Sequence, residues 1–147
     1  MSIADRTAET VWTGNLAQGA GSINSGSGAL KDQSVTWAAR TETPGGKTSP
    51  EELAAAAHSS CYSMALALSL GEHKLTPERL HVSSTVTLDA VDGLPTIVSS
   101  ALTVKAVVPG VDAATFQSIV DEASALCPVS RLFAGASITV DATLESA

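Results

Sequence analysis

The chain contains two cysteines, and each lies in a setting where a thiol can take part in chemistry. Cys61 is in the middle of residues 53–70, a predicted helical run of eighteen residues without Asp, Glu, Lys or Arg. Cys127 directly precedes Pro128, at the start of a predicted helical turn whose free backbone N–H groups favour a thiolate. Because the thiolate is the nucleophilic form of cysteine, both residues are candidates for a reactive site.

Simpler and competing interpretations apply to the same residues. His58 lies three residues before Cys61, so on a helix the two share a face and are able to bind one metal ion. A structural zinc site needs four ligands in close spacings, which Cys127, His73 and His81 do not provide. A cysteine hydrolase is disfavoured because no glycine-framed nucleophile surrounds Cys61. The purely structural alternatives are a core histidine at His58, a small buried apolar residue at Cys61 and a capping residue at Cys127.

Composition and charge limit the classes of function. The 147 residues suffice for one domain with its own core, which we place at residues 1–147. The formal net charge of −7, with eight Lys plus Arg and no basic run, argues against a nucleic-acid or anionic-membrane surface. No apolar stretch follows a basic region at the N-terminus, so we expect a cytoplasmic protein. In a reducing compartment, two cysteines are more often free, metal-bound or redox-active than joined in a permanent structural disulfide.

The reactive residues must be positioned by the elements around them. A glycine-rich segment near the N-terminus predicts an antiparallel hairpin, followed by a third strand that ends at Arg40. Ser49 as N-cap, Pro50 at the first position and Glu52 at the third predict a helix start with a capping box. This helix is predicted to stop at Gly71.

The apolar part of this helix also reaches the length at which a helix can span a membrane. It contains His58, four serines and several alanines. We therefore expect a helix that is buried in protein, without membrane contact.

The second half of the chain predicts a hairpin, a helix and a final strand. Apolar and polar residues alternate over 80–88 and 96–108, and the Asp92–Gly93 turn between them predicts a loop somewhat longer than two residues. Asp112 is the predicted N-cap of a second apolar-faced helix, and residues 137–146 form the last strand. We therefore predict an α+β fold with two antiparallel sheet regions around a central apolar helix.

Three stretches of the sequence together resemble a known family. They are SPEELAAAAHSSCYSMALALSL at 49–70, CPVSRLF at 127–133 and the tryptophan–glycine strand VWTGNL at 11–16. The combination closely resembles the osmotically inducible protein OsmC and its relatives, the organic hydroperoxide resistance proteins, over about residues 11–144. The Ala-Ala-His before Cys61 fits the OsmC branch. The resemblance implies an OsmC-like fold, an intertwined homodimer, and a thiol peroxidase without metal or organic cofactor.

The resemblance also implies roles for four residues. Cys61 matches the peroxidatic cysteine and Cys127 the resolving cysteine. Glu51 matches the glutamate at the helix start, and Arg40 the arginine in the strand before the loop. The Cys61 thiolate then attacks a peroxide, and its sulfenic acid condenses with Cys127 to a disulfide. A guanidinium at Arg40, held by Glu51, favours the thiolate and stabilises charge on the leaving oxygen.

The predicted partners are an organic hydroperoxide, an external dithiol reductant such as a lipoyl-type group, and a second copy of the chain. Ten residues of one helix separate Glu51 from Cys61, about 15 Å along the axis. We therefore expect Glu51 and Arg40 to act on the partner's Cys61, in two equivalent sites. From the residues alone, two other functions stay open: a thiol module that senses oxidant without turnover, and a metal-binding structural protein.

Overall fold

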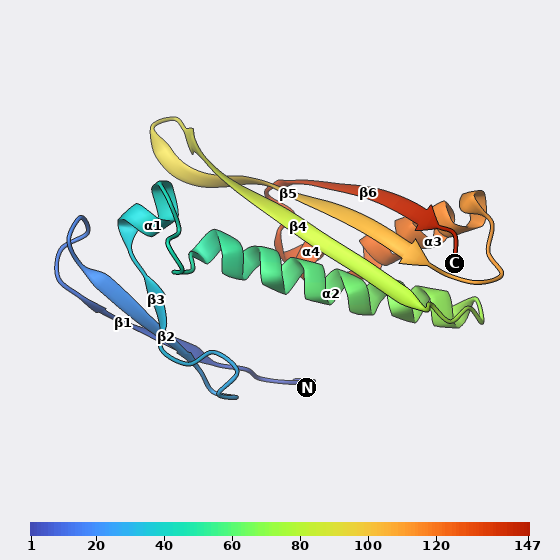
Figure 1. Cartoon of the computed structure of the whole chain (residues 1–147), viewed down its shortest axis with the longest axis horizontal. Helices are drawn as coiled ribbons and strands as arrows, with labels where there is room; N and C mark the ends of the chain where they lie inside the picture. Colours follow the sequence, from blue (N-terminus) through green and yellow to red (C-terminus); the bar gives the residue numbers. More distant parts are fainter. The chain divides into compact units, whose positions relative to one another are not determined.

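The computed structural model describes all 147 residues and contains two compact parts, residues 1–53 and 54–147. Helix α2 (Pro50–Glu72) begins in the first part and continues in the second. The first part also contains β1 (Ala8–Thr13), β2 (Ala20–Ser25), β3 (Gln33–Val35) and α1 (Trp37–Thr41). The second part contains β4 (Arg79–Val91), β5 (Leu94–Val107), α3 (Ala113–Leu126), α4 (Pro128–Leu132) and β6 (Ser137–Glu145) (Figure 1). One domain over residues 1–147 stays a prediction.

The first three strands form an antiparallel sheet in the order β1-β2-β3, which confirms the predicted hairpin. Gly21 in β2 pairs with Trp12 on one side and Val35 on the other. A Cβ at Gly21 would lie 2.7 Å from the Val35 side chain and 3.1 Å from the Trp12 ring. A glycine at this position therefore lets side chains of both flanking strands close over β2.

Arg40 lies on α1, so the prediction of a strand that ends at this residue is wrong. The strand stops at Val35, and Thr36 becomes the N-cap of α1 by accepting a 3.1 Å hydrogen bond from the N–H of Ala39. This cap stabilises the first turn of a helix in place of a continued strand. Arg40 is consequently the basic residue in the last turn of α1, where a cation is favourable.

The predicted start of α2 is confirmed, with one difference in the capping box. The Ser49 hydroxyl accepts a 3.1 Å hydrogen bond from the N–H of Glu52, and Pro50 is the first helical residue. The Glu52 carboxylate accepts a 2.8 Å hydrogen bond from the Thr48 hydroxyl, and not from the N–H of Ser49. The helix ends at Glu72, one residue later than predicted.

The strands β4, β5 and β6 form a second sheet, with β5 in the centre. The antiparallel strands β4 and β5 are joined by the two-residue turn Asp92–Gly93, whose φ angles of 52° and 78° are both positive. The prediction of a longer loop is therefore wrong, because the strands extend up to this tight turn. Strand β6 pairs in parallel with β5, so the second sheet is mixed rather than wholly antiparallel.

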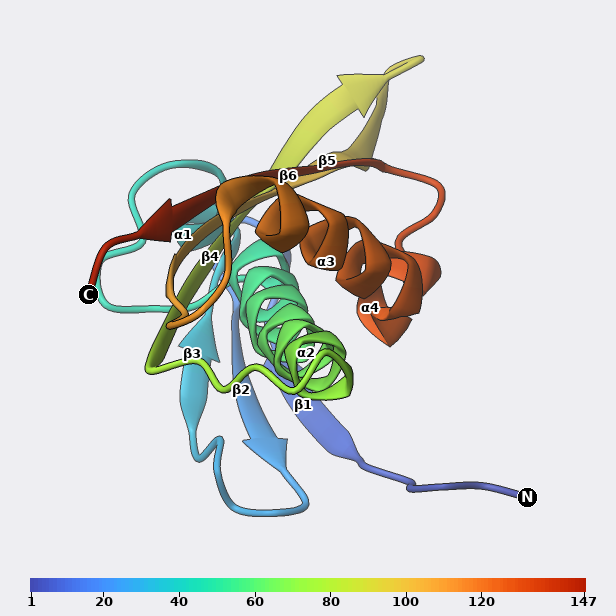
Figure 2. The ribbon, with the colours of Figure 1, turned by 90° about the vertical axis from the view of Figure 1, so that its right-hand side faces the viewer.

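Helices cover one face of the second sheet, where α2 and α3 lie side by side (Figure 2). The inward residues of β5 are buried and alternate with exposed ones. The predicted N-cap of α3 is confirmed, because Asp112 accepts a 2.8 Å hydrogen bond from the N–H of Thr115. The core joins residues of α2, β5 and α3, including Tyr62, Leu66, Leu102, Val104, Phe116, Ile119 and Val120.

Helix α2 has one buried face and one exposed face, both without charged residues from 54 to 71. Five residues of the inner face have no exposed surface: His58, Tyr62, Leu66, Ser69 and Leu70. On the outer face, Met64 is 71% exposed and Leu68 is 58% exposed. By length and composition α2 also qualifies as a membrane span. Because its inner face builds the core of the second part, we assign it to a folded domain.

Candidate active site

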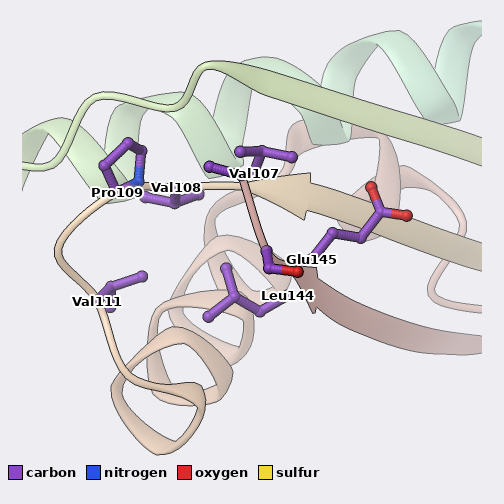
Figure 3. A pocket seen from close by; sticks show the side chains of 8 residues that line it. Val107, Val108, Pro109, Val111, Leu144 and Glu145 are labelled. Atoms are coloured by element: carbon purple, nitrogen blue, oxygen red, sulfur yellow. The ribbon is translucent and has the colours of Figure 1, made fainter.

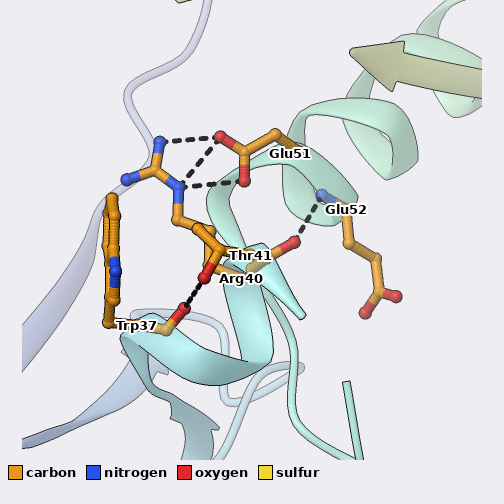
Figure 4. Close-up of polar contacts among 6 residues, drawn as sticks. Trp37, Arg40, Thr41, Glu51 and Glu52 are labelled. Carbon is orange, nitrogen blue, oxygen red and sulfur yellow. Dashed lines mark hydrogen bonds and ion pairs between the residues drawn. The ribbon is translucent and has the colours of Figure 1, made fainter. Parts of the chain in front are cut away.

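Arg40 and Glu51 form the ion pair that the sequence analysis expected. The Nη2 atom of Arg40 lies 2.7 Å from Oε1 of Glu51, and its Nε atom lies 3.1 Å from both carboxylate oxygens (Figure 4). The guanidinium also lies over the ring of Trp37, with the Arg40 Cζ 5.8 Å from the ring centroid. These two contacts fix the plane of the guanidinium, because one holds its edge and the other its face.

The Arg40 side chain borders an apolar hollow of about 380 Å³ in the same part of the chain. Much of the lining is aromatic or aliphatic, including Trp12, Leu16, Ile23, Trp37, Pro50 and Leu53. A hollow of this kind suits a ligand with an apolar body and a polar end that meets the guanidinium.

Cys61 and Cys127 lie in the second part of the chain, and both are free thiols. Cys61, near the middle of α2, is partly exposed, whereas Cys127 has no exposed surface. The two thiols are close enough for Cys127 to affect the pKa of Cys61 by a hydrogen bond and by charge. The structure therefore brings together the two cysteines that lie 66 positions apart in the sequence.

Burial is the largest influence on the Cys61 thiol and raises its pKa. The neighbouring Cys127 raises the pKa further, whereas the backbone N–H of Val129 in α4 donates to the sulfur and lowers it. The net effect is a raised pKa, and no Lys or Arg contributes to it. The backbone N–H groups of this turn were expected to favour a Cys127 thiolate, whereas one of them, that of Val129, lowers the pKa of Cys61. These neighbours together favour the thiol over the thiolate, and none of them is a cation.

His58 is fully buried, and both nitrogens of its ring have partners. Nδ1 lies 2.6 Å from the Ser100 hydroxyl, and Nε2 lies 2.7 Å from the Ser130 hydroxyl. Burial lowers the pKa of His58, which favours the neutral ring. This is the satisfied core histidine of the simpler interpretation. No group of three or more His, Cys, Asp and Glu residues is placed to hold a metal ion.

A second hollow, of about 340 Å³, lies at the end of β5 and β6 (Figure 3). Its lining is mainly aliphatic, with Val107, Val111 and Leu144 among the side chains. The charged residue in its lining is Glu145, which is ion-paired with Arg79. This hollow has no thiol, imidazole or free cation in its lining, so it is not a candidate for the reactive site.

The four predicted site residues thus form two pairs. Arg40 and Glu51 belong to residues 1–53, and the two cysteines belong to residues 54–147. Ten residues of the continuous helix α2 separate Glu51 from Cys61, about 15 Å along the axis. No glutamate side chain spans that length.

The partners of these residues were not among the predicted site residues. Trp37 was assigned to a strand, although an aromatic residue three positions before an arginine is a signal for stacking once a helix is assumed. Ser100 and Ser130 lie 42 and 72 positions from His58, and no local pattern marks them. The N–H of Val129 is likewise a backbone group, which no side-chain motif reveals.

Residues 43–143 match the family model described as OsmC-like protein. The chain is 43% identical to the peroxiredoxin OsmC of Escherichia coli (strain K12) over 135 residues, which are 92% of this chain and 93% of that protein. It is 33% identical to the organic hydroperoxide resistance protein of Xanthomonas axonopodis pv. citri (strain 306), over 70% of this chain and 69% of that protein.

Solved structures with similar folds carry related names. The organic hydroperoxide resistance protein OsmC of Legionella pneumophila superposes with a TM-score of 0.75 at 22% identity, over 98% of this chain and 100% of that one. The organic hydroperoxide resistance protein OhrB of Bacillus subtilis gives a TM-score of 0.71 at 24% identity, over 93% of this chain and 98% of that one. At these identities the likeness establishes the shared α+β fold.

Proposed function

Because this chain belongs to the OsmC-like protein family, we propose that it is a cysteine-based thiol peroxidase that reduces organic hydroperoxides to alcohols. A peroxidase role agrees with the names of its curated relatives. The observation that carries the detailed mechanism is the proximity of Cys61 and Cys127, the only two cysteines of the chain. One is partly exposed and the other is buried beside it, which suits one sulfur that meets substrate and one that resolves.

The proposed cycle has three balanced steps. The Cys61 thiolate attacks one peroxide oxygen, the O–O bond breaks, and the leaving alkoxide takes up a proton to become the alcohol. Cys61 keeps the other oxygen as a sulfenic acid. The Cys127 thiol then attacks the Cys61 sulfur, water leaves, and a disulfide forms. An external dithiol reduces the disulfide and is itself oxidised to a disulfide.

The cation that Cys61 requires is, in this proposal, Arg40 of a partner chain. Within its own surroundings the thiol has a raised pKa and no cationic neighbour. Arg40 is held by Glu51 and Trp37 beside an apolar hollow, with a guanidinium that still has an Nη1 group to donate. Paired with the partner's Cys61, it would favour the thiolate and stabilise negative charge on the leaving oxygen.

The outer face of α2 supports the homodimer in this proposal. Met64 and Leu68 are exposed on this face, and Ala57 and Gly71 extend the uncharged stripe in both directions. An uncharged exposed stripe of this kind is typical of a surface that another protein covers. Small residues such as Ala57 allow a second helix to approach closely. In an antiparallel pair of α2 helices, the first turn of one helix would lie near the middle of the other.

Exposure also indicates where the reductant enters. In the disulfide, Cys61 is the sulfur nearer to solvent, because Cys127 has no exposed surface in the reduced chain. A dithiol therefore attacks Cys61, and Cys127 is the leaving thiol. We keep the cytoplasm as the proposed location, where thiol-based reduction is available.

Steady turnover tests the proposed function, with a dithiol as the electron donor. The uncharged surroundings of Cys61 and the apolar hollow predict a higher kcat/KM for tert-butyl or cumene hydroperoxide than for hydrogen peroxide. Burial of an alkyl group should contribute roughly a tenfold preference or more. Equal efficiency with hydrogen peroxide would indicate a general peroxidase. A single oxidation without turnover would indicate a thiol sensor.

A further inference from the structure

A chain of hydrogen bonds runs through the second part of the protein and ends at Ser130, three residues after Cys127. The Ser84 and Ser100 hydroxyls are 2.9 Å apart, Ser100 meets Nδ1 of His58 at 2.6 Å, and Nε2 meets Ser130 at 2.7 Å. One serine–serine contact and two serine–histidine contacts thus join β4, β5, α2 and α4. His58 is 0%, Ser100 1% and Ser130 8% exposed, so water does not compete for the bonds.

The chain is fully satisfied when His58 is neutral. A neutral imidazole has one N–H donor and one acceptor nitrogen, and each serine hydroxyl can donate one bond and accept others. Either ring tautomer therefore keeps both His58 contacts, if the Ser100 and Ser130 hydroxyls rotate to match. Because both nitrogens are used, His58 has none left for a substrate or a metal ion.

Each residue of the His58–Ser130 contact is close in sequence to one of the two cysteines. His58 precedes Cys61 by three residues on α2, and Ser130 follows Cys127 by three residues. Between them, the N–H of Val129 donates to the Cys61 sulfur. Without the His58–Ser130 hydrogen bond, the five-residue helix α4 would be joined to α2 here only by packing and by the weak bond from the Val129 N–H to the Cys61 sulfur.

An aromatic contact also joins His58 to α4. The ring of Phe133 meets the His58 ring at 83°, with the centroids 5.3 Å apart. Phe133 is the C-cap of α4, so the C-terminal end of this short helix also contacts His58. An edge-to-face pair of this kind adds to the packing of α4 without fixing a proton.

We propose that His58 is a positioning residue for disulfide formation: through Ser130 it holds α4, and with it Cys127, within reach of the Cys61 sulfenic acid. This inference rests on the proposed function. The Cys127 thiol attacks the Cys61 sulfur and releases water, whereas a second peroxide oxidises the same sulfenic acid to sulfinic acid. A looser α4 slows the first reaction and leaves the second unchanged. The fraction of sulfinic acid therefore reports the position of Cys127.

The experiment compares Ser130→Ala with Ser69→Ala after one exposure of the reduced protein to a fixed excess of cumene hydroperoxide. Ser69 is a matched control, because its hydroxyl is also buried but has no hydrogen-bond partner. Intact-mass analysis gives the ratio of sulfinic acid to disulfide. We expect this ratio to rise roughly fivefold in Ser130→Ala, from the loss of one buried hydrogen bond, and to stay at the wild-type value in Ser69→Ala.

A second variant, His58→Phe, removes both serine contacts at similar volume and should raise the ratio at least as much. If it does not fold, Ser130→Ala still decides the question. Equal ratios in Ser130→Ala, Ser69→Ala and wild type would overturn the role of His58. A wild-type protein that forms no Cys61–Cys127 disulfide would instead contradict the proposed function, so the two failures are distinguishable.

Discussion

The immediate surroundings of Cys61 favour its thiol form. Burial and Cys127 both raise its pKa, and the N–H of Val129 is the one group that lowers it. A peroxidatic cysteine works as a thiolate, so these influences oppose the chemistry that the site is proposed to perform. In the proposed dimer a guanidinium reverses this balance, and Arg40, which is held by Glu51 and Trp37, is the group proposed to supply it.

The first prediction is that Arg40→Gln shifts the titration of Cys61 to higher pH. Removal of the positive charge leaves burial as the dominant influence, so the thiolate becomes less populated at neutral pH. The rate of Cys61 alkylation by iodoacetamide, measured against pH in a Cys127→Ser background, gives the midpoint. Peroxidase kcat should fall roughly 100-fold, because a donor to the leaving oxygen is also lost.

Arg131→Gln is the matched control for this measurement. Arg131 lies in the last turn of α4, close to Cys127 in sequence, and has no ion pair. We expect its removal to leave the alkylation midpoint in place. A midpoint that moves in Arg131→Gln and stays in Arg40→Gln would mean that the cation has been assigned to the wrong arginine.

At the scale of elements, the sequence predicts what is local and misses what is distant. The start of α2 and the N-cap of α3 depend on residues within one turn, and both were predicted. Arg40 was placed on a strand because the third extended segment was carried past Val35, whereas the Thr36 cap starts a helix there. The two candidate cysteines were found from their types and settings. Their pairing was expected only from the family resemblance. Both this proximity and the serines that hold His58 depend on tertiary packing that no window of sequence contains.

The second prediction concerns Ser69 on α2. Its hydroxyl is fully buried and has no hydrogen-bond partner, so folding removes it from water without compensation. Ser69→Ala should therefore raise the free energy of unfolding by about 1 kcal/mol, with a further contribution from the better helix propensity of alanine. Urea denaturation followed by circular dichroism gives this value. A clear loss of stability would show that the hydroxyl makes a hydrogen bond in solution.

At the scale of the whole molecule, two features of a single chain need an explanation: the uncharged exposed face of α2, and the distance along α2 between Glu51 and Cys61. Met64 and Leu68 are exposed, although they belong to a helix whose other face is core. Glu51 and Cys61 are about 15 Å apart on that helix. The proposed homodimer accounts for both features, because an antiparallel α2 of a second copy would cover the exposed stripe and bring the partner's Glu51 to Cys61.

The third prediction is that two inactive chains restore activity when they are refolded together. Cys61→Ser and Glu51→Ala are mixed as unfolded chains in equal amounts. In each mixed dimer, one site regains both residues and the other lacks both. With random pairing, activity should return to about a quarter of the wild-type value per chain. Confirmed mixed dimers without activity would place Glu51 with the Cys61 of its own chain.

The central claim is that Cys61 and Cys127 form one peroxide-driven thiol pair, and counting thiols tests it most directly. The reduced protein has two free thiols per chain. After one equivalent of cumene hydroperoxide per chain, with alcohol formation followed in parallel, we predict none. In Cys127→Ser, the Cys61 thiol should be lost to a sulfenic acid that dimedone traps, whereas Cys61→Ser should leave Cys127 unreacted. Two thiols that persist in the wild type, or a Cys61→Ser protein that consumes the hydroperoxide, would contradict the account.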